Sequence, residues 1–201
     1  MHSSISYFYI NLSHRLDRNK SILRQFSNFN ITNYTRINAI KEQNGNIGCS
    51  KSHILALKQF IESKIDIGIF LEDDFEFTVS KEIYYSILNN IIDDSNLSWD
   101  VVLISGNVRH KEPYNKFLDR CFESQTASGY VVTQKFAKTL LANYEDGLEM
   151  LKNTGINSKY AIDQYWKILQ KQYNWFITNP KCGEQAKSYS DIQKQFVYYG
   201  C

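Results

Sequence analysis

The sequence predicts an α/β fold, a layered αβα sandwich with a mainly parallel central sheet. Continuous apolar runs of strand length alternate with helix-length amphipathic segments through the first two-thirds of the chain. The 201 residues, 43% of them hydrophobic, suffice for one sizeable core, so we expect a single domain over residues 1–201. The two prolines and the absence of low-complexity tracts argue against a disordered chain.

Strands are predicted where β-branched and aromatic residues form short runs between polar or glycine-containing turns. These runs cover residues 5–12, 33–40, 66–71, 99–105 and 173–178, with two shorter ones inside 121–133. Residues 108–120 are polar, basic and irregular, which predicts a long loop.

Helices are predicted where apolar residues recur at helical spacing. They cover about residues 18–29, a segment ending near 63, 80–92, 134–143, a broken piece at 147–152, and 160–170. Asp17 or Ser13 can cap the first helix and Ser50 or Ser52 the second, after a tight turn at two glycines. His53 then falls in the first turn of the second helix, where a structural role is expected.

Composition excludes some classes of function. A charged fraction of 22% and a net charge of +2 give no nucleic-acid or membrane-surface footprint. The cysteines are widely spaced, which favours a reduced compartment over a zinc site or a disulfide framework, although one or two disulfides stay open. Because no signal peptide and no run of ~18 apolar residues is visible, a cytoplasmic protein without a transmembrane segment is expected if the chain is complete.

An acidic stretch at residues 69–77, IFLEDDFEF, organises the prediction of function. Its apolar half is typical of a buried strand and ends in Glu72, Asp73 and Asp74. Ligands bind at the carboxyl ends of strands in open α/β sheets. Adjacent carboxylates repel one another unless a positive group lies among them, and a hard divalent cation takes oxygen ligands. A metal site and a solvated acidic turn both remain open.

Basic side chains near predicted helix starts are candidates for binding phosphate. Arg15 and Arg18 follow the first strand, where guanidinium groups and a helix dipole can hold an anion. The alternative is a surface loop with an Asp–Arg pair. Lys51 near the second helix start offers a further phosphate contact. Asp163 lies in a predicted first helical turn, where the dipole stabilises a carboxylate and gives it a structural explanation.

Six segments in order resemble glycosyltransferase family 25, which includes lipooligosaccharide and collagen galactosyltransferases. They are YINLSHRLDR, RINAI followed by GNIGCSKSH, IFLEDDFEF, GYVVTQKFAKTLL, IDQYW and NPKCGEQAKSYSDI. The resemblance spans nearly the whole chain. It implies a GT-A-like, Rossmann-like fold, a UDP-sugar donor of galactose or glucose, and a divalent metal, with Mn²⁺ expected. The acceptor is then a hydroxyl on a glycan, glycolipid or protein.

The resemblance also implies roles for particular residues. The acidic triplet looks like the family's DxD element, with Glu72 and Asp74 as metal ligands. Asp73, Arg15, Arg18 and Lys51 are then expected at the donor nucleotide. An inverting reaction needs a carboxylate base near the acceptor hydroxyl; Asp163 is the first candidate and Asp191 the second.

Two other functions fit the same residues. A metal-dependent phosphohydrolase also uses clustered carboxylates, but it releases phosphate without an acceptor. A catalytically inactive nucleotide-sugar or carbohydrate-binding domain can keep the fold after losing activity. Incubation with nucleotide sugars separates these functions from transfer.

Overall fold

An eight-stranded mixed sheet forms the centre of the structure, a computed structural model that describes residues 3–186, 188–190 and 195–197. Its strand order is β2-β1-β3-β8-β5-β9-β7-β6, and β7 and β8 run opposite to the other six strands. The strands are β1 (Ile5–Asn11), β2 (Tyr34–Asn38), β3 (Ile67–Glu72), β5 (Val101–Leu103), β6 (Asn107–Pro113), β7 (Leu118–Gln125), β8 (Gly129–Thr133) and β9 (Trp175–Thr178). The predicted α/β class with a mostly parallel sheet is confirmed.

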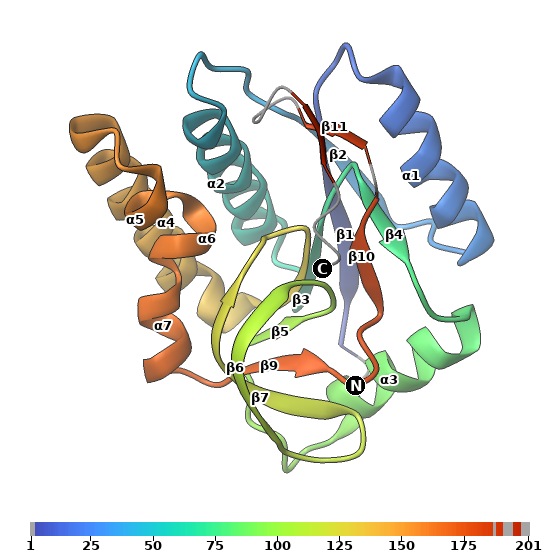
Figure 1. Ribbon diagram of the computed structural model, residues 1–201. Coiled ribbons are helices and arrows are strands. Elements are labelled where there is room, and N and C mark those ends of the chain that lie inside the picture. Colours follow the sequence, from blue (N-terminus) through green and yellow to red (C-terminus); the bar gives the residue numbers. More distant parts are fainter. Residues whose placement is uncertain (1–2, 187, 191–194, 198–201) are drawn as a thin grey trace.

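Helices cover both faces of this sheet (Figure 1). One face packs against α1 (Leu16–Asn28) and α3 (Lys81–Asp93). The other packs against α2 (Gly45–Ser63), α4 (Gln134–Thr154), α6 (Ile162–Tyr165) and α7 (Lys167–Gln172), and α5 (Asn157–Tyr160) joins α4 to α6. Two small sheets add β4 (Phe75–Phe77) with β10 (Gly183–Gln185), and β11 (Ser188–Ser190) with β12 (Gln195–Val197).

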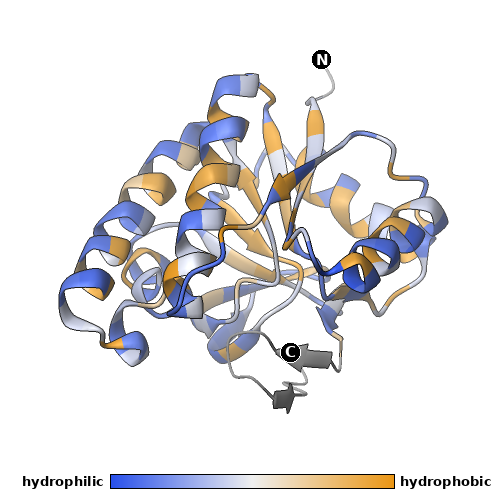
Figure 2. Cartoon of the chain, turned by 90° about the horizontal axis from the view of Figure 1, so that it is seen from above, coloured by the Kyte–Doolittle hydropathy of each residue, from blue (hydrophilic) through white to orange (hydrophobic). Residues whose placement is uncertain are grey.

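The core follows from the alternation of side chains along buried strands. In β1, Tyr7 and Tyr9 point to the α1 and α3 side, whereas Phe8 and Ile10 point to the α2 and α4 side. Strands buried on both faces are apolar without interruption, which is why these segments are recognisable in the sequence. Figure 2 shows the apolar strands between the two helix layers, whose outer surfaces are polar.

The predicted loop at residues 108–120 is wrong, because most of it belongs to the β6–β7 hairpin. β6 lies at the edge of the sheet and most of its side chains are exposed. Its sequence therefore lacks the apolar pattern from which a strand can be predicted. Lys111 and Pro113 in this strand are typical of edges that resist pairing with another chain. Backbone hydrogen bonds to β7 therefore form the strand without a pattern in its side chains.

The predicted start of the second helix is also wrong. α2 begins at Gly45, and the side chain of Asn44 caps it by accepting a hydrogen bond from the Asn46 N–H. Ser50 and Ser52 lie inside the helix, where their hydroxyls donate to the carbonyls of Asn46 and Gly48. The helix therefore starts about two turns earlier than predicted. Neither Asp17 nor Ser13 caps α1, whose N-cap is Arg15, whereas the side chain of Ser80 caps α3 by accepting a hydrogen bond from the Ile83 N–H.

The predicted break near residue 147 is absent, and α4 is continuous from Gln134 to Thr154. Gly147 serves close packing, because a Cβ there would lie 2.8 Å from Cδ1 of Tyr165. The helix predicted for residues 160–170 is instead divided among α5, α6 and α7. No helix among the described residues is long and apolar enough to cross a bilayer.

Candidate active site

The acidic triplet lies where β3 leaves the sheet. β3 is buried along its length until Glu72, and the chain then turns at Asp73 and Asp74 into β4. The Glu72 N–H donates to the carbonyl of Ser128, just before β8, at 2.9 Å. The carboxyl ends of β1 and β3 lie side by side, because Ile10 pairs with Glu72. The triplet therefore stands at the carboxyl ends of the parallel strands, as predicted, which is where open α/β sheets generally bind ligands.

A guanidinium group lies among these carboxylates. Arg18 Nη1 is 2.9 Å from Asp73 Oδ1 and 2.9 Å from Asp74 Oδ2. Asp73 also accepts a hydrogen bond from Asn11 Nδ2 at 2.6 Å. Burial raises the pKa of Asp73 although Arg18 and Asn11 oppose the rise. Asp73 therefore has positioning partners for both oxygens, and Arg18 neutralises part of the acidic cluster.

Glu72 and Asp74 converge on one amide group. Gln185 Nε2, at the end of β10, lies 3.1 Å from Glu72 Oε2 and 3.4 Å from Asp74 Oδ1. Burial first, and the charge of Glu72 second, raise the pKa of Asp74 to about 7. Two carboxylate oxygens thus face one point that a hydrogen-bond donor occupies. Sequence reasoning did not single out Gln185, which lies 111 residues from Asp74 along the chain.

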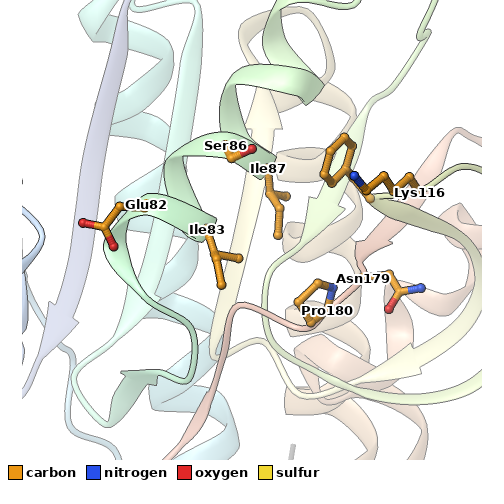
Figure 3. Close-up of a pocket in the computed structure, with 8 residues that line it drawn as sticks. Glu82, Ile83, Ser86, Ile87, Lys116, Asn179 and Pro180 are labelled. Atoms are coloured by element: carbon orange, nitrogen blue, oxygen red, sulfur yellow. The ribbon is translucent and has the colours of Figure 1, made fainter.

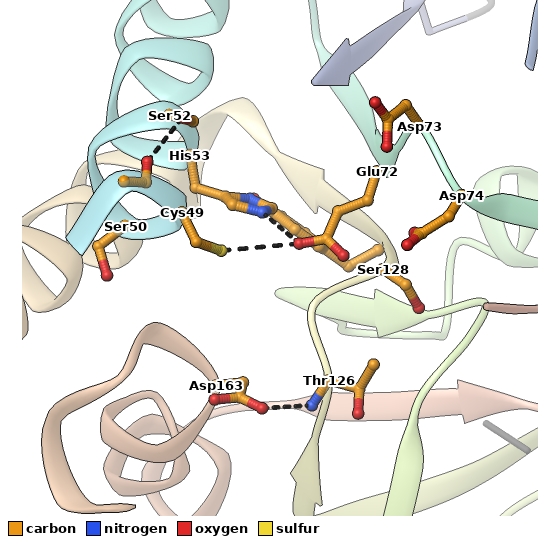
Figure 4. A network of polar contacts seen from close by, with 12 residues as sticks. Cys49, Ser50, Ser52, His53, Glu72, Asp73, Asp74, Thr126, Ser128 and Asp163 are labelled. Atoms are coloured by element: carbon orange, nitrogen blue, oxygen red, sulfur yellow. Dashed lines mark hydrogen bonds and ion pairs between the residues drawn. The ribbon is translucent and has the colours of Figure 1, made fainter. Parts of the chain in front are cut away.

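Glu72 also faces α2 (Figure 4). Its Oε1 lies 3.3 Å from His53 Nε2 and 3.6 Å from Cys49 Sγ, and His53 Nδ1 lies 3.0 Å from the Tyr130 hydroxyl. Burial acts to raise the pKa of Glu72, but His53, Arg18 and Cys49 together outweigh it, and the pKa is lowered. The expected first-turn position of His53 is wrong: it is buried, two turns into α2, and in contact with the acidic site.

Asp163 lies across from this cluster at the start of α6 (Figure 4). Its Oδ2 accepts a hydrogen bond from the Thr126 N–H at 2.9 Å. Burial chiefly raises the pKa of Asp163, and the negative charge of Glu72 adds to the rise. Because α6 has four residues, the helix-dipole explanation for Asp163 is weak. Asp163 instead lies near enough to the acidic triplet for the charge of Glu72 to act on it.

Two other candidates, Arg15 and Lys51, form ion pairs with residues outside the acidic triplet. Lys51 forms an ion pair with Glu42 and lies inside α2, so its predicted position at a helix start is wrong. Arg15 is the N-cap residue of α1, and its Nη2 lies 2.9 Å from Asp17 Oδ2. Asp191 lies outside the described residues.

A separate groove lies beside α3 (Figure 3). It has a volume of about 310 Å³ and is lined by Glu82, Ile83, Ser86, Ile87, Lys116, Phe117, Asn179 and Pro180. None of the acidic triplet lines it. Its mostly apolar wall shows no convergent set of catalytic groups.

Neither a family model nor a curated protein sequence matches the chain. Solved structures with a similar fold include a glycosyltransferase involved in the glycosylation of the major capsid of PBCV-1, with a TM-score of 0.56 and 10% identity over 95% of this chain and 96% of that one. A mannose-1-phosphate geranyltransferase from Thermus thermophilus is similar over 92% of this chain and 75% of its own, with a TM-score of 0.50 and 8% identity. These likenesses show the fold, a GT-A-like αβα sandwich.

Proposed function

We propose that the chain is a glycosyltransferase related to family 25, which moves a hexose from a UDP-sugar to an acceptor hydroxyl. The convergence of Glu72 and Asp74 on the Gln185 amide carries the proposal, because two carboxylate oxygens face one point at the ligand-binding edge of a GT-A-like sheet. The six family-like segments support the assignment to family 25, and galactose or glucose is the proposed sugar.

The donor set at this point fits a hard divalent cation. Carboxylate oxygens are the preferred ligands of Mg²⁺ and Mn²⁺, and such ions are held by one or two carboxylates together with substrate phosphates. Glu72 and Asp74 would hold the ion once the Gln185 amide moves aside. A bound Mn²⁺ would supply a positive charge that stabilises the departing nucleoside diphosphate.

The chain's own residues have distinct roles in this proposal. Arg18 orients Asp74 and Asp73 and places a positive charge beside the donor phosphates. Asp163 accepts the proton of the acceptor hydroxyl while the hydroxyl attacks opposite the leaving group, which inverts the configuration of the sugar carbon. The raised pKa of Asp163 makes it a stronger base than an ordinary carboxylate. The Thr126 N–H fixes the orientation of that carboxylate.

A specific observation favours one alternative. Arg18, Asn11, His53 and Gln185 satisfy the carboxylates without a metal ion. That arrangement also suits an inactive domain that binds a nucleotide sugar or a carbohydrate.

A panel of nucleotide sugars with Mn²⁺ separates the possibilities. A true donor should raise the melting temperature by mass action and then be hydrolysed slowly to nucleoside diphosphate and sugar. Stabilisation without turnover would identify the inactive binding domain. Release of inorganic phosphate would identify a phosphohydrolase. No stabilisation by any nucleotide sugar would contradict the proposal.

A further inference from the structure

A second set of metal-ligating atoms lies on the other side of Glu72. Cys49 Sγ, a ring nitrogen of His53 and a Glu72 carboxylate oxygen all lie within 4.8 Å of one another. Cys49 and His53 are four residues apart in α2 and therefore project from the same face of the helix. Two ligands at this helical spacing, with a third from another element, are a known arrangement for binding zinc.

The distances suit tetrahedral coordination. Zn²⁺ binds sulfur at about 2.3 Å, imidazole nitrogen at about 2.0 Å and carboxylate oxygen at about 2.0 Å, which puts oxygen about 3.5 Å from sulfur and about 3.3 Å from nitrogen. Cys49 Sγ is 3.6 Å from Glu72 Oε1, and His53 Nε2 is 3.3 Å from the same oxygen. Two of the three distances between ligand atoms therefore already have the length that a tetrahedral zinc site requires.

The surroundings of His53 support the same role. Metal-ligating histidines usually bond through their second ring nitrogen to a fixed partner, which holds the ring in place. His53 Nδ1 has such a partner in the Tyr130 hydroxyl at 3.0 Å, and both side chains are fully buried. The ring therefore holds Nε2 beside Glu72 before any ion arrives.

We propose that Cys49, His53 and Glu72 form a binding site for Zn²⁺, with the fourth position left to water. Thiolate and imidazole ligands favour zinc over Mg²⁺ or Mn²⁺, which prefer oxygen. Binding releases the Cys49 thiol proton to solvent as the Zn–S bond forms. Burial and the nearby carboxylates raise the pKa of Cys49, and a cation among those carboxylates compensates their charge.

This site shares Glu72 with the proposed catalytic cation site. Zn²⁺ draws Oε1 toward α2 and so competes for a ligand of the Mn²⁺ site, which makes zinc an inhibitor of transfer. The inhibition rests on the proposed function, whereas zinc binding does not. Cysteine spacing in the sequence does not reveal this site, because it uses a single cysteine and its other two ligands are histidine and glutamate.

Titration with Co²⁺, a spectroscopic substitute for Zn²⁺, tests the site directly. The wild-type protein should develop a thiolate-to-cobalt charge-transfer band at one equivalent, and Zn²⁺ should abolish it. Cys49→Ser should lose the band and weaken Zn²⁺ binding by more than about 100-fold, since removing even a group that only supports a ligand costs about 10- to 100-fold. The matched control is Cys121→Ser, which removes a buried cysteine on β7 and should keep the band.

A measurement on the wild-type protein covers the case in which Cys49→Ser does not fold. Zinc-edge X-ray absorption of the one-to-one complex should show one sulfur neighbour at about 2.3 Å. A shell of nitrogen and oxygen alone, or a cobalt band that survives in Cys49→Ser, would overturn the site.

If no nucleotide sugar binds but the cobalt band forms, the proposed function fails and the zinc site stands. If transfer occurs, equimolar Zn²⁺ should reduce it in the wild type, and undiminished transfer would contradict the shared ligand.

Discussion

Arg18 forms an ion pair with Asp74, with 2.9 Å between Nη1 and Oδ2, and both side chains are nearly buried. This contact joins the first helix to the acidic turn after β3. It supplies the positive group that three adjacent carboxylates require. The same guanidinium also reaches Asp73, so one side chain fixes two members of the triplet.

Removing this guanidinium should destabilise the fold. Arg18→Met leaves Asp73 and Asp74 buried without their cation, which should lower the free energy of unfolding by about 3 kcal/mol at pH 8. Urea unfolding in metal-free buffer measures the change. The control is Lys58→Met, which breaks the exposed Lys58–Glu145 pair and should cost less than about 1 kcal/mol. Equal effects of the two substitutions would contradict a structural role for Arg18.

The raised pKa of Asp74 makes stability depend on pH. In metal-free protein the pKa is about 7, against 3.8 for an ordinary aspartate. The contribution of Asp74 is therefore fully present below pH 3.8 and is lost as the pH rises through 7. Asp74→Asn cannot titrate, so its melting temperature relative to wild type should increase between about pH 4 and pH 8. A difference that stays constant over this range would refute the pKa shift.

Asp163→Asn should separate catalysis from structure. Asn can still accept the hydrogen bond from the Thr126 N–H, but it cannot take a proton. Turnover should fall by about 100-fold or more, with donor affinity unchanged. In wild type, turnover should fall on the acid side of a pKa above 3.8. A lower melting temperature with unchanged specific activity would assign Asp163 to structure alone.

Gly183 should not tolerate a side chain. A Cβ there would lie 2.2 Å from Cζ of Phe75 and 2.8 Å from the Glu76 carbonyl oxygen. Gly183→Ala must displace β10, and we expect a loss of about 1–3 kcal/mol in the free energy of unfolding. The neighbouring Glu184→Ala is the control and should change it by less than about 0.5 kcal/mol. Unfolding in urea compares the two.

Much of the fold could be predicted because the buried strands are apolar on both sides. β3 is the clearest example, since its burial ends at Glu72, where the acidic triplet begins. β6 could not be found in the same way, because an exposed edge strand depends on backbone hydrogen bonds and needs no side-chain pattern.

The site was predicted only in part. The acidic triplet and Arg18 lie close together because β1 and β3 are neighbours, which a parallel sheet makes foreseeable. The contact of His53 with Glu72 depends on where α2 begins, and the Asn44 cap was overlooked. Gln185 reaches the site through the pairing of β10 with β4, which no local pattern indicates.

Mn²⁺-dependent turnover of a UDP-hexose, compared between wild type and Asp74→Asn, decides whether the acidic triplet is a catalytic metal site. Release of UDP, and transfer once an acceptor is known, should require Mn²⁺ in the wild-type protein. Asp74→Asn should stay folded and lose nearly all of this activity, because it lacks one of the two carboxylates that face the Gln185 amide. Full activity of Asp74→Asn, or of the wild type after chelation of the metal, would contradict metal-dependent transfer at this site.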